Sequence, residues 1–174
     1  MNPIKAADAL IRKGVKADIA LWYKDYLTSR YLHLEVKGVS IAREVSIGCP
    51  QGGVLSTLLW NIAFDDLLKI FDKTGITIVG YADDGSIMVT GDNIKVLYKT
   101  MNEALAKCQA WAERYGLDIS PEKTEYMICT SKLRKSYTIP QCGITLKGKQ
   151  VDRVTSVKYL GLTIDHKLSW HEVS

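Results

Sequence analysis

Two adjacent carboxylates are the side chains of this sequence best placed to do chemistry. Asp83 and Asp84 fall in Val-Gly-Tyr-Ala-Asp-Asp-Gly (79–85), between apolar runs 76–79 and 87–90 that read as the strands of a hairpin. Acidic groups at the end of a buried strand are costly unless a cation or a donor neutralises them. Phosphoryl-transfer enzymes hold Mg²⁺ through a few carboxylates plus substrate phosphates, so the pair predicts metal ligands. The alternative is an ordinary turn, because Asp and Gly are common in tight turns.

A second acidic doublet, Asp65-Asp66, lies in a different setting. It falls inside segment 54–73, whose apolar residues recur at helical intervals and which closes before Gly75. Adjacent positions on a helix point about 100° apart, so these two carboxylates are not aimed at one ligand. We interpret this doublet as solvated or capping charge on the polar face of a helix.

A glycine-rich segment, Ser-Ile-Gly-Cys-Pro-Gln-Gly-Gly-Val-Leu-Ser (46–56), precedes that helix. Glycines permit close approach of the backbone to a ligand, and the N-terminus of a helix favours a phosphate. The segment is not a P-loop, because no Gly-Lys-Ser/Thr closes it. Standing alone, a glycine-rich turn before a helix is more often just a turn.

Helical and strand patterns alternate along the chain, which predicts a layered α+β domain with helices on one face of an antiparallel sheet. Asn93 is expected to cap the longest helix, whose apolar stripe stops at Gly116. The expected elements are helices 3–13 and 16–29 on either side of Gly14, a hairpin of 31–36 and 41–46 around Lys37-Gly38, the helix 54–73, the hairpin around the acidic pair, the helix from Asn93 to Gly116, and strands around 124–130, 143–151 and 154–164.

Length and composition are those of one folded domain: 174 residues, of which 47% are hydrophobic. No apolar run reaches the roughly 18 residues that span a bilayer, and the N-terminus does not read as a signal peptide. We therefore expect an intracellular protein of the nucleus or cytoplasm that is neither secreted nor bound to a membrane. The cysteines Cys49, Cys108, Cys129 and Cys142 form no Cys-x-x-Cys pair, so they read as reduced thiols.

The net charge of +4 is concentrated at one end of the chain. Residues 121–174 hold 9 Lys+Arg and 5 Asp+Glu, whereas residues 1–120 hold 14 of each. A basic end on a neutral body suits a polyanionic partner such as a nucleic acid.

Four motifs in order, which cover nearly the whole chain, together resemble the reverse transcriptases of non-LTR (LINE-type, Jockey-like) retrotransposons. Cys-Pro-Gln-Gly-Gly-Val-Leu-Ser (49–56) and Tyr-Ala-Asp-Asp (81–84) are similar to the third and fourth core motifs of that family. Gly-Leu-Asp-Ile-Ser-Pro-Glu-Lys-Thr-Glu (116–125) resembles the next motif. Lys-Tyr-Leu-Gly-Leu-Thr-Ile-Asp (158–165) resembles the primer-grip motif, and Leu-Ser-Trp (168–170) the segment after it.

The resemblance implies a polymerase palm, an antiparallel sheet with helices packed on one face, truncated at its N-terminus and running into the start of the thumb. Residues 1–130 would be the palm, without the fingers and the first catalytic motif, and residues 131–174 the primer-grip hairpin and the start of the thumb. The parent enzyme would be an RNA-directed DNA polymerase that takes an RNA template, a DNA primer and deoxynucleoside triphosphates. Two Mg²⁺ (or Mn²⁺) ions would stabilise the attacking and leaving oxygens. Oligomeric state stays open.

Site residues follow from the same resemblance, position by position. Asp83 and its neighbour Asp84 would ligate the metal ions. The loop residues Gln51, Gly52 and Gly53 would contact the incoming nucleotide and the template.

The remaining implied roles concern the primer and the leaving group. Tyr81 would pack near the primer terminus, and Lys123 would act on the pyrophosphate leaving group. Tyr159, Leu160 and Gly161 would hold the primer strand. The alternatives are an exposed surface lysine at position 123 and an ordinary core strand at 159–161.

Two departures from the family pattern matter. Thr57 stands where a proline commonly follows the loop serine, and threonine is able to cap a helix. The first carboxylate motif, a strand that ends in Asp, is missing: Asp8, Asp18 and Asp25 all fall in helical patterns. Two-metal transfer needs carboxylates from both motifs. We therefore expect this chain alone not to polymerise.

Two other functions are weighed against the polymerase fragment. A non-catalytic nucleic-acid-binding remnant of a retrotransposon fits the basic end and the missing motif. A palm-fold nucleotide cyclase needs a different metal turn and leaves the Gln-Gly segment unexplained.

Overall fold

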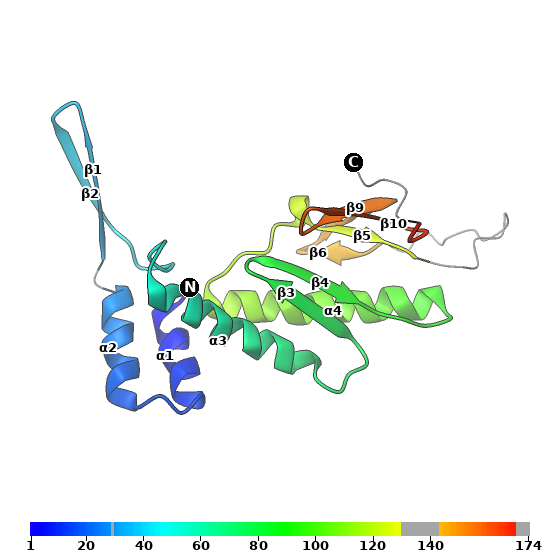
Figure 1. Cartoon of the computed structure of the whole chain (residues 1–174), viewed down its shortest axis with the longest axis horizontal. Helices are drawn as coiled ribbons and strands as arrows, with labels where there is room; N and C mark the ends of the chain where they lie inside the picture. The colour runs from blue at the N-terminus through cyan, green and yellow to red at the C-terminus, as the bar shows by residue number, and fades with distance from the viewer. Residues whose placement is uncertain (29, 130–142, 170–174) are drawn as a thin grey trace. The chain divides into compact units, whose positions relative to one another are not determined.

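The computed structural model describes residues 1–28, 30–129 and 143–169, which fall into two compact units (Figure 1). The first unit comprises Met1–Met88 with Ala110–Asp118, and the second Val89–Gln109 with Ile119–Ser174. The chain thus leaves the first unit and returns to it, and one long helix contributes to both. The predicted division at residue 130 falls in the stretch outside the described residues, so it stays a prediction.

Three helices build most of the first unit: α1 (Pro3–Arg12), α2 (Ala17–Thr28) and α3 (Val54–Phe71). The helix α1 begins where its sequence supplies a cap, because the Asn2 side chain accepts hydrogen bonds from the N–H groups of Ile4 and Lys5 at 3.0 and 3.3 Å. Gly14 adopts a φ of 85°, which ends the first helical segment and lets α2 lie beside it (Figure 1). The three predicted helices are confirmed.

Two antiparallel hairpins complete the first unit. Strands β1 (Tyr31–Val36) and β2 (Val39–Glu44) meet at the predicted Lys37-Gly38 turn, where both residues have positive φ. Strands β3 (Thr77–Tyr81) and β4 (Asp84–Met88) reach closer to their turn than predicted. Gly80 pairs with Gly85 and Tyr81 with Asp84, so only two residues remain between the strands.

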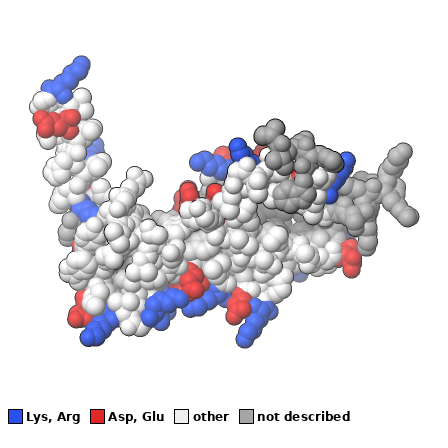
Figure 2. All heavy atoms as spheres, in the orientation of Figure 1, with Lys and Arg blue, Asp and Glu red and all other residues white. Residues whose placement is uncertain are grey.

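The hairpin of β1 and β2 exposes a continuous apolar face. Its cross-strand register places Leu32, Leu34 and Val36 on the same face as Val39 and Ile41. Each of these side chains is at least half exposed. In the space-filling view the hairpin is drawn largely white, with charged atoms gathered near its tip (Figure 2).

The second unit consists of the first part of the helix α4 (Ile94–Tyr115) and a set of short strands. Asn93 caps α4 as predicted, since its side-chain oxygen accepts hydrogen bonds from the N–H groups of Lys95 and Val96 at 3.0 and 3.4 Å. The other elements are the 3-10 turn η1 (Pro121–Lys123) and the strands β5 (Glu125–Met127), β6 (Thr145–Leu146), β7 (Lys149–Gln150), β8 (Asp152–Val154), β9 (Ser156–Tyr159) and β10 (Leu162–Asp165).

The fold class is α+β, but the expected single antiparallel sheet does not appear among the described residues. Their strands form five two-stranded pairs, of which four are antiparallel and one, β5 with β8, is parallel. The antiparallel pairs are hairpins, which short turns can close locally. Parallel pairing requires a long connection between its strands, and the chain between β5 and β8 is long enough to include the β6–β7 hairpin.

Each unit has a small core of its own. Alanines on the inner face of α1 allow close packing against α2 and α3, and the end of α4 adds aromatic side chains. The buried residues of the first unit are Met1, Ala6, Ala7, Ala9, Leu10, Ala20, Tyr23, Leu27, Leu59, Ala63, Leu67, Phe71, Trp111, Ala112 and Tyr115. Those of the second unit are Tyr98, Ala104, Leu105, Cys108, Ile144, Leu146 and Val151. None of the helices in the part of the chain that the structure describes is both long and apolar enough to cross a membrane.

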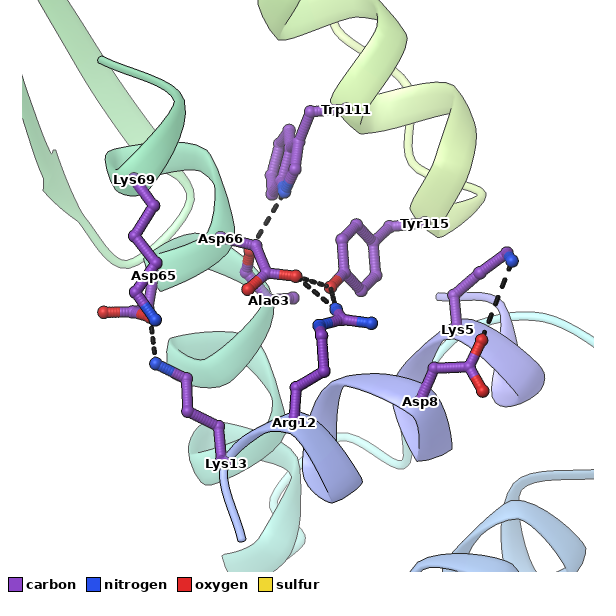
Figure 3. A network of polar contacts seen from close by, with 10 residues as sticks. All are labelled: Lys5, Asp8, Arg12, Lys13, Ala63, Asp65, Asp66, Lys69, Trp111 and Tyr115. Carbon is purple, nitrogen blue, oxygen red and sulfur yellow. Dashed lines mark hydrogen bonds and ion pairs between the residues drawn. The ribbon is translucent and has the colours of Figure 1, made fainter. Parts of the chain in front are cut away.

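One carboxylate, that of Asp66 on α3, joins three helices (Figure 3). It accepts a hydrogen bond from Arg12 Nη2 on α1 at 2.5 Å and another from the Tyr115 hydroxyl on α4 at 2.6 Å. Burial acts to raise the pKa of Asp66, but the bonds from Tyr115 and Arg12 outweigh it and leave this pKa below its ordinary value. Burial, reinforced by the bond to Asp66, raises the pKa of Tyr115 to about 12.

The neighbouring Asp65 forms ion pairs with Lys13 and, at 3.1 Å, with Lys69. The two acidic side chains of the doublet therefore point to different partners, as their helical spacing predicts. The interpretation as solvated or capping charge is wrong for Asp66, whose side chain is only 15% exposed and is paired with Arg12. The Asp65 side chain is 39% exposed, so it is partly solvated as well as ion-paired. This doublet holds helices together.

Loss of the Tyr115 hydroxyl tests the network. Tyr115→Phe leaves the partly buried Asp66 carboxylate one donor short, so we expect the free energy of unfolding at pH 7 to fall by about 1–3 kcal/mol. A tyrosine with a raised folded-state pKa contributes stability that is fully present below the unfolded value of about 10 and is lost as the pH rises through about 12. The difference between wild type and variant should therefore shrink between pH 10 and 12.

Urea unfolding at fixed pH values from 7 to 12 measures this difference. Tyr31→Phe removes a hydroxyl from a side chain that is 62% exposed and serves as the matched control. A difference that stays constant over this pH range would contradict the assigned role of Tyr115.

Candidate active site

The acidic turn, residues 81–84, projects from the end of the β3–β4 hairpin. Ala82 and Asp83 form the two-residue turn, and Asp84 is the first residue of β4 rather than part of the turn. Both carboxylates are exposed. Within the described residues, no hydrogen bond or ion pair joins either of them to another side chain. Two carboxylates are thus available to a ligand from solution.

The exposure of this pair corrects one step of the sequence argument. Burial at the end of an apolar strand was expected to demand a neutralising cation, but the face of the hairpin that carries Asp84 is open. Tyr81, the cross-strand partner of Asp84, is 64% exposed. Val79 and Met88, whose side chains lie on the same face of the hairpin, are 43% and 52% exposed. A metal is therefore not required to offset burial, and only the chemistry of adjacent carboxylates still favours one.

The other face of the hairpin packs on α3 through residues that the sequence analysis did not single out. A Cβ added to Gly80 would lie 2.2 Å from two ring carbons of Phe64, so the strand touches this ring directly. One turn earlier in α3, the indole Nε1 of Trp60 donates a hydrogen bond to the Ala82 carbonyl at 2.6 Å. Their i, i+4 spacing on a helix was the available signal that both residues face the same neighbour.

The Gln-Gly loop, residues 46–53, leads directly into the N-terminus of α3. Gly48 and Gly52 have φ values of 102° and 76°, which other residues rarely adopt. Two bonds shape the loop: Ser56 Oγ donates to the Pro50 carbonyl at 2.7 Å, and Arg30 Nη2 donates to the Gly48 carbonyl at 3.0 Å.

The first turn of α3 has no side-chain cap. Gly53 occupies the N-cap position, and the structure records no side-chain hydrogen bond there. Thr57, which stands in place of the family's proline, does not cap this helix, because it is already the fourth residue of α3. Exposed Gln51 and Gly52 stand before this turn, and the N–H groups at the start of a helix suit an anion such as a phosphate.

The predicted leaving-group residue, Lys123, belongs to the second unit. It ends the 3-10 turn η1 and is exposed. Its neighbour Glu122 pairs with Lys149 and accepts a hydrogen bond from Ser120 at 3.0 Å. The bond from Lys149 has the largest effect on the pKa of Glu122, which is lowered to about 2.

The predicted primer grip is also in the second unit, and it forms a turn rather than a core strand. Tyr159 ends β9, and Leu160 and Gly161 connect it to β10 with φ values of 49° and 85°. Leu160 is half exposed, whereas the Tyr159 hydroxyl is buried and has no hydrogen-bond partner in the described part of the chain. The structure therefore brings the acidic turn and the Gln-Gly loop together on α3, while Lys123 and the 159–161 turn belong to the other unit.

A complete three-ligand metal centre is absent from the described residues. No group of three or more His, Cys, Asp or Glu side chains there is arranged to hold an ion. Asp8, Asp18 and Asp25 lie in α1 and α2 as their sequence pattern predicts, so none of them ends a strand. Asp83 and Asp84 lie side by side in the chain and are exposed, so the metal ligands predicted from the sequence stay a prediction.

The described cysteines are free thiols. Cys49 lies in the Gln-Gly loop, Cys129 is exposed, and burial raises the pKa of Cys108 to about 11. Cys142 lies outside the described residues. A buried thiol with a raised pKa is protonated at neutral pH and chemically quiet, so Cys108 belongs to the core.

Comparison with known proteins identifies the family of this chain. Residues 7–164 match the family model described as reverse transcriptase (RNA-dependent DNA polymerase). Because the match covers most of the chain and both halves of the site on α3, the chain belongs to the reverse transcriptase family. The matched range also includes Lys123 and the 159–161 turn.

Curated relatives come from insect retrotransposons of the non-LTR kind. The chain is 31% identical over 172 residues to a probable RNA-directed DNA polymerase from transposon BS of Drosophila melanogaster, with 94% of this chain and 19% of that protein covered. It is 29% identical over 153 residues to the RNA-directed DNA polymerase from mobile element jockey of the same species, with 84% and 16% covered. A Pol polyprotein from type-1 retrotransposable element R1 2 of Nasonia vitripennis is 28% identical over 126 residues, with 72% of this chain and 31% of that protein covered.

These relatives confirm the Jockey-like, non-LTR resemblance found in the motifs. They are also much longer, since the chain spans less than a third of each of them. What the whole polymerases do therefore comes to this chain only as a proposal.

The contact between Gly80 and Phe64 can be tested by substitution, because the cross-strand neighbour Gly85 provides a matched control. Gly80→Ala would place a methyl group inside the Phe64 ring, and we expect it to lower the free energy of unfolding by about 1–3 kcal/mol. Gly85 is the cross-strand partner of Gly80, and nothing lies within 4 Å of a Cβ added there. Gly85→Ala should leave stability within about 0.5 kcal/mol of wild type.

Chemical denaturation of the two variants measures both values. The double variant Gly80→Ala with Phe64→Leu should recover part of the loss, because the smaller side chain makes room for the methyl group. Equal effects of the two alanines would show that the hairpin does not rest on α3.

Proposed function

We propose that this chain is the palm portion of an RNA-directed DNA polymerase of a non-LTR retrotransposon and runs into the start of its thumb. The observation that carries the proposal is the joint position of two family motifs on one helix. The Gln-Gly loop precedes α3, and the acidic turn rests on the side of the same helix through Trp60 and Phe64. The reaction is transfer of a nucleotide from a deoxynucleoside triphosphate to a DNA primer on an RNA template.

Each part of the site has a role in that reaction. The exposed carboxylates of Asp83 and Asp84 would hold Mg²⁺ or Mn²⁺, which neutralises phosphate charge when bound. Gln51, Gly52 and Gly53 would contact the incoming nucleotide and the template beside the uncapped N-terminus of α3. Tyr81, on the same hairpin face as Asp84, would lie near the primer terminus.

The second unit would contribute contacts with the pyrophosphate and with the primer strand. Lys123 would neutralise the pyrophosphate leaving group, and its exposure is compatible with that role. Tyr159, Leu160 and Gly161 would hold the primer, where a hairpin turn brings backbone close to a strand. The basic end of the sequence supports a nucleic-acid partner.

A second function, nucleic-acid binding without catalysis, fits the isolated 174-residue chain better. The described residues provide two carboxylates at the acidic turn, whereas a pair of ions about 3.5–4 Å apart requires further ligands. Binding and catalysis are therefore tested separately.

Primer extension distinguishes these two functions. We expect the purified chain to show no Mg²⁺-dependent extension of a DNA primer on an RNA template, because two carboxylates do not complete a two-metal site. We expect it still to bind the primer–template duplex, with an affinity that falls as salt is raised. Extension by the wild type that disappears in Asp83→Asn would show that the metal site is complete within these 174 residues.

The acidic turn should nevertheless bind a divalent ion weakly. In an amide NMR spectrum of the chain, millimolar Mn²⁺ should broaden the signals of residues 82–85 first, because the turn carries two exposed adjacent carboxylates. The signals of Asp65 and Asp66 are the internal control, since those carboxylates are ion-paired. Asp83→Asn combined with Asp84→Asn should abolish the selective broadening, and its persistence in that variant would contradict the proposed metal ligands.

A further inference from the structure

The hydrogen bond from Trp60 connects helix α3 to the acidic turn, across 22 residues of sequence. The indole Nε1 donates to the Ala82 carbonyl at 2.6 Å, and this carbonyl belongs to the peptide group between Ala82 and Asp83. A peptide group is planar, so a donor that fixes its oxygen also fixes the orientation of the Asp83 N–H. The bond therefore acts on the backbone from which Asp83 projects.

Ala82 needs such support because its own backbone is strained. It is the first of the two turn residues and has a φ of 51°, in the left-handed region that favours glycine. A residue other than glycine persists there only when its surroundings hold it. The indole N–H of Trp60 binds the carbonyl of Ala82 itself, so Trp60 stabilises the residue whose backbone is strained.

Trp60 is itself held firmly in place. Its ring packs against Phe64 at a centroid distance of 6.1 Å and meets Trp111 edge-on at 6.4 Å. Trp111 in turn donates a hydrogen bond to the Ala63 carbonyl of α3 at 2.9 Å. A donor on a helix, fixed by two aromatic neighbours, can set the position of a turn more closely than a mobile surface side chain can.

We propose that Trp60 is a positioning residue for the acidic turn: its indole N–H holds the Ala82 carbonyl and thereby sets the direction in which Asp83 and Asp84 present their carboxylates to a divalent cation. That a cation binds at the turn rests on the proposed function. That Trp60 fixes the backbone of the turn does not depend on a metal. Trp60 acts through Ala82 and touches neither the ion nor a substrate.

The ring and the N–H of Trp60 can be separated by substitution. Trp60→Phe keeps an aromatic ring against Phe64 and Trp111 and removes the donor. Trp22→Phe is the matched control, because Trp22 lies on α2, is 58% exposed and stacks on Tyr26 rather than on the turn. Near-ultraviolet circular dichroism and urea unfolding establish that both variants are folded.

Two NMR readouts test the proposal on the 174-residue chain. In wild type, the Trp60 indole proton should exchange with solvent more slowly than that of Trp22, and Mn²⁺ should broaden it at lower concentration. In Trp60→Phe, amide exchange at Ala82–Gly85 should accelerate, and the Mn²⁺ concentration that half-broadens these signals should rise about two- to tenfold, the loss expected for one hydrogen bond. Trp22→Phe should change neither quantity.

The outcomes separate this inference from the proposed function. If the turn of the wild type binds no Mn²⁺ but its amide exchange accelerates in Trp60→Phe, the metal site is refuted and the positioning role stands. A folded Trp60→Phe with unchanged exchange and unchanged Mn²⁺ broadening overturns the positioning role. If Trp60→Phe does not fold, the wild type still decides, because a Trp60 indole proton that exchanges as fast as that of Trp22 also overturns it.

Discussion

The salt bridge and hydrogen bond that converge on Asp66 are the interactions on which the rest of the first unit depends. Through this carboxylate, α3 is joined to α1 by Arg12 and to the end of α4 by Tyr115. Both halves of the candidate site are attached to α3, the Gln-Gly loop at its N-terminus and the acidic turn along its side. A charged group outside both motifs thus fixes the helix to which they are attached. Removal of one of its partners would leave a partly buried charge without a counter-charge or a donor, which lowers stability.

Much of the local structure could be predicted from the sequence, because its signals act over a few residues. Asn2 and Asn93 cap helices, and Gly14 and Gly116 end helical segments, through bonds and backbone angles that depend on near neighbours. The Lys37-Gly38 turn was predicted for the same reason. The family motifs likewise identified the acidic turn and the Gln-Gly loop, since each is a continuous run of residues.

Contacts between distant segments could not be predicted in this way. The sequence does not show that Trp60 reaches Ala82, or that Phe64 lies under Gly80, because a helical pattern gives the face of a side chain but not its neighbour. The same limit explains the Asp65-Asp66 doublet: its spacing predicted diverging carboxylates, yet Lys13 and Arg12 come from another helix. The exposure of Asp83 and Asp84 was also missed, because the apolar strands around them were taken to be buried.

The hairpin of β1 and β2 has a practical consequence for anyone who handles this chain. No described residue covers its apolar face, which consists of Leu32, Leu34, Val36, Val39 and Ile41. Each of its two strands is hydrogen-bonded to the other strand only, so the outer backbone edge of each strand has no partner strand among the described residues. Natural proteins shield such edges and faces, since they pair readily with other chains. Self-association through this hairpin is therefore expected when the isolated chain is concentrated.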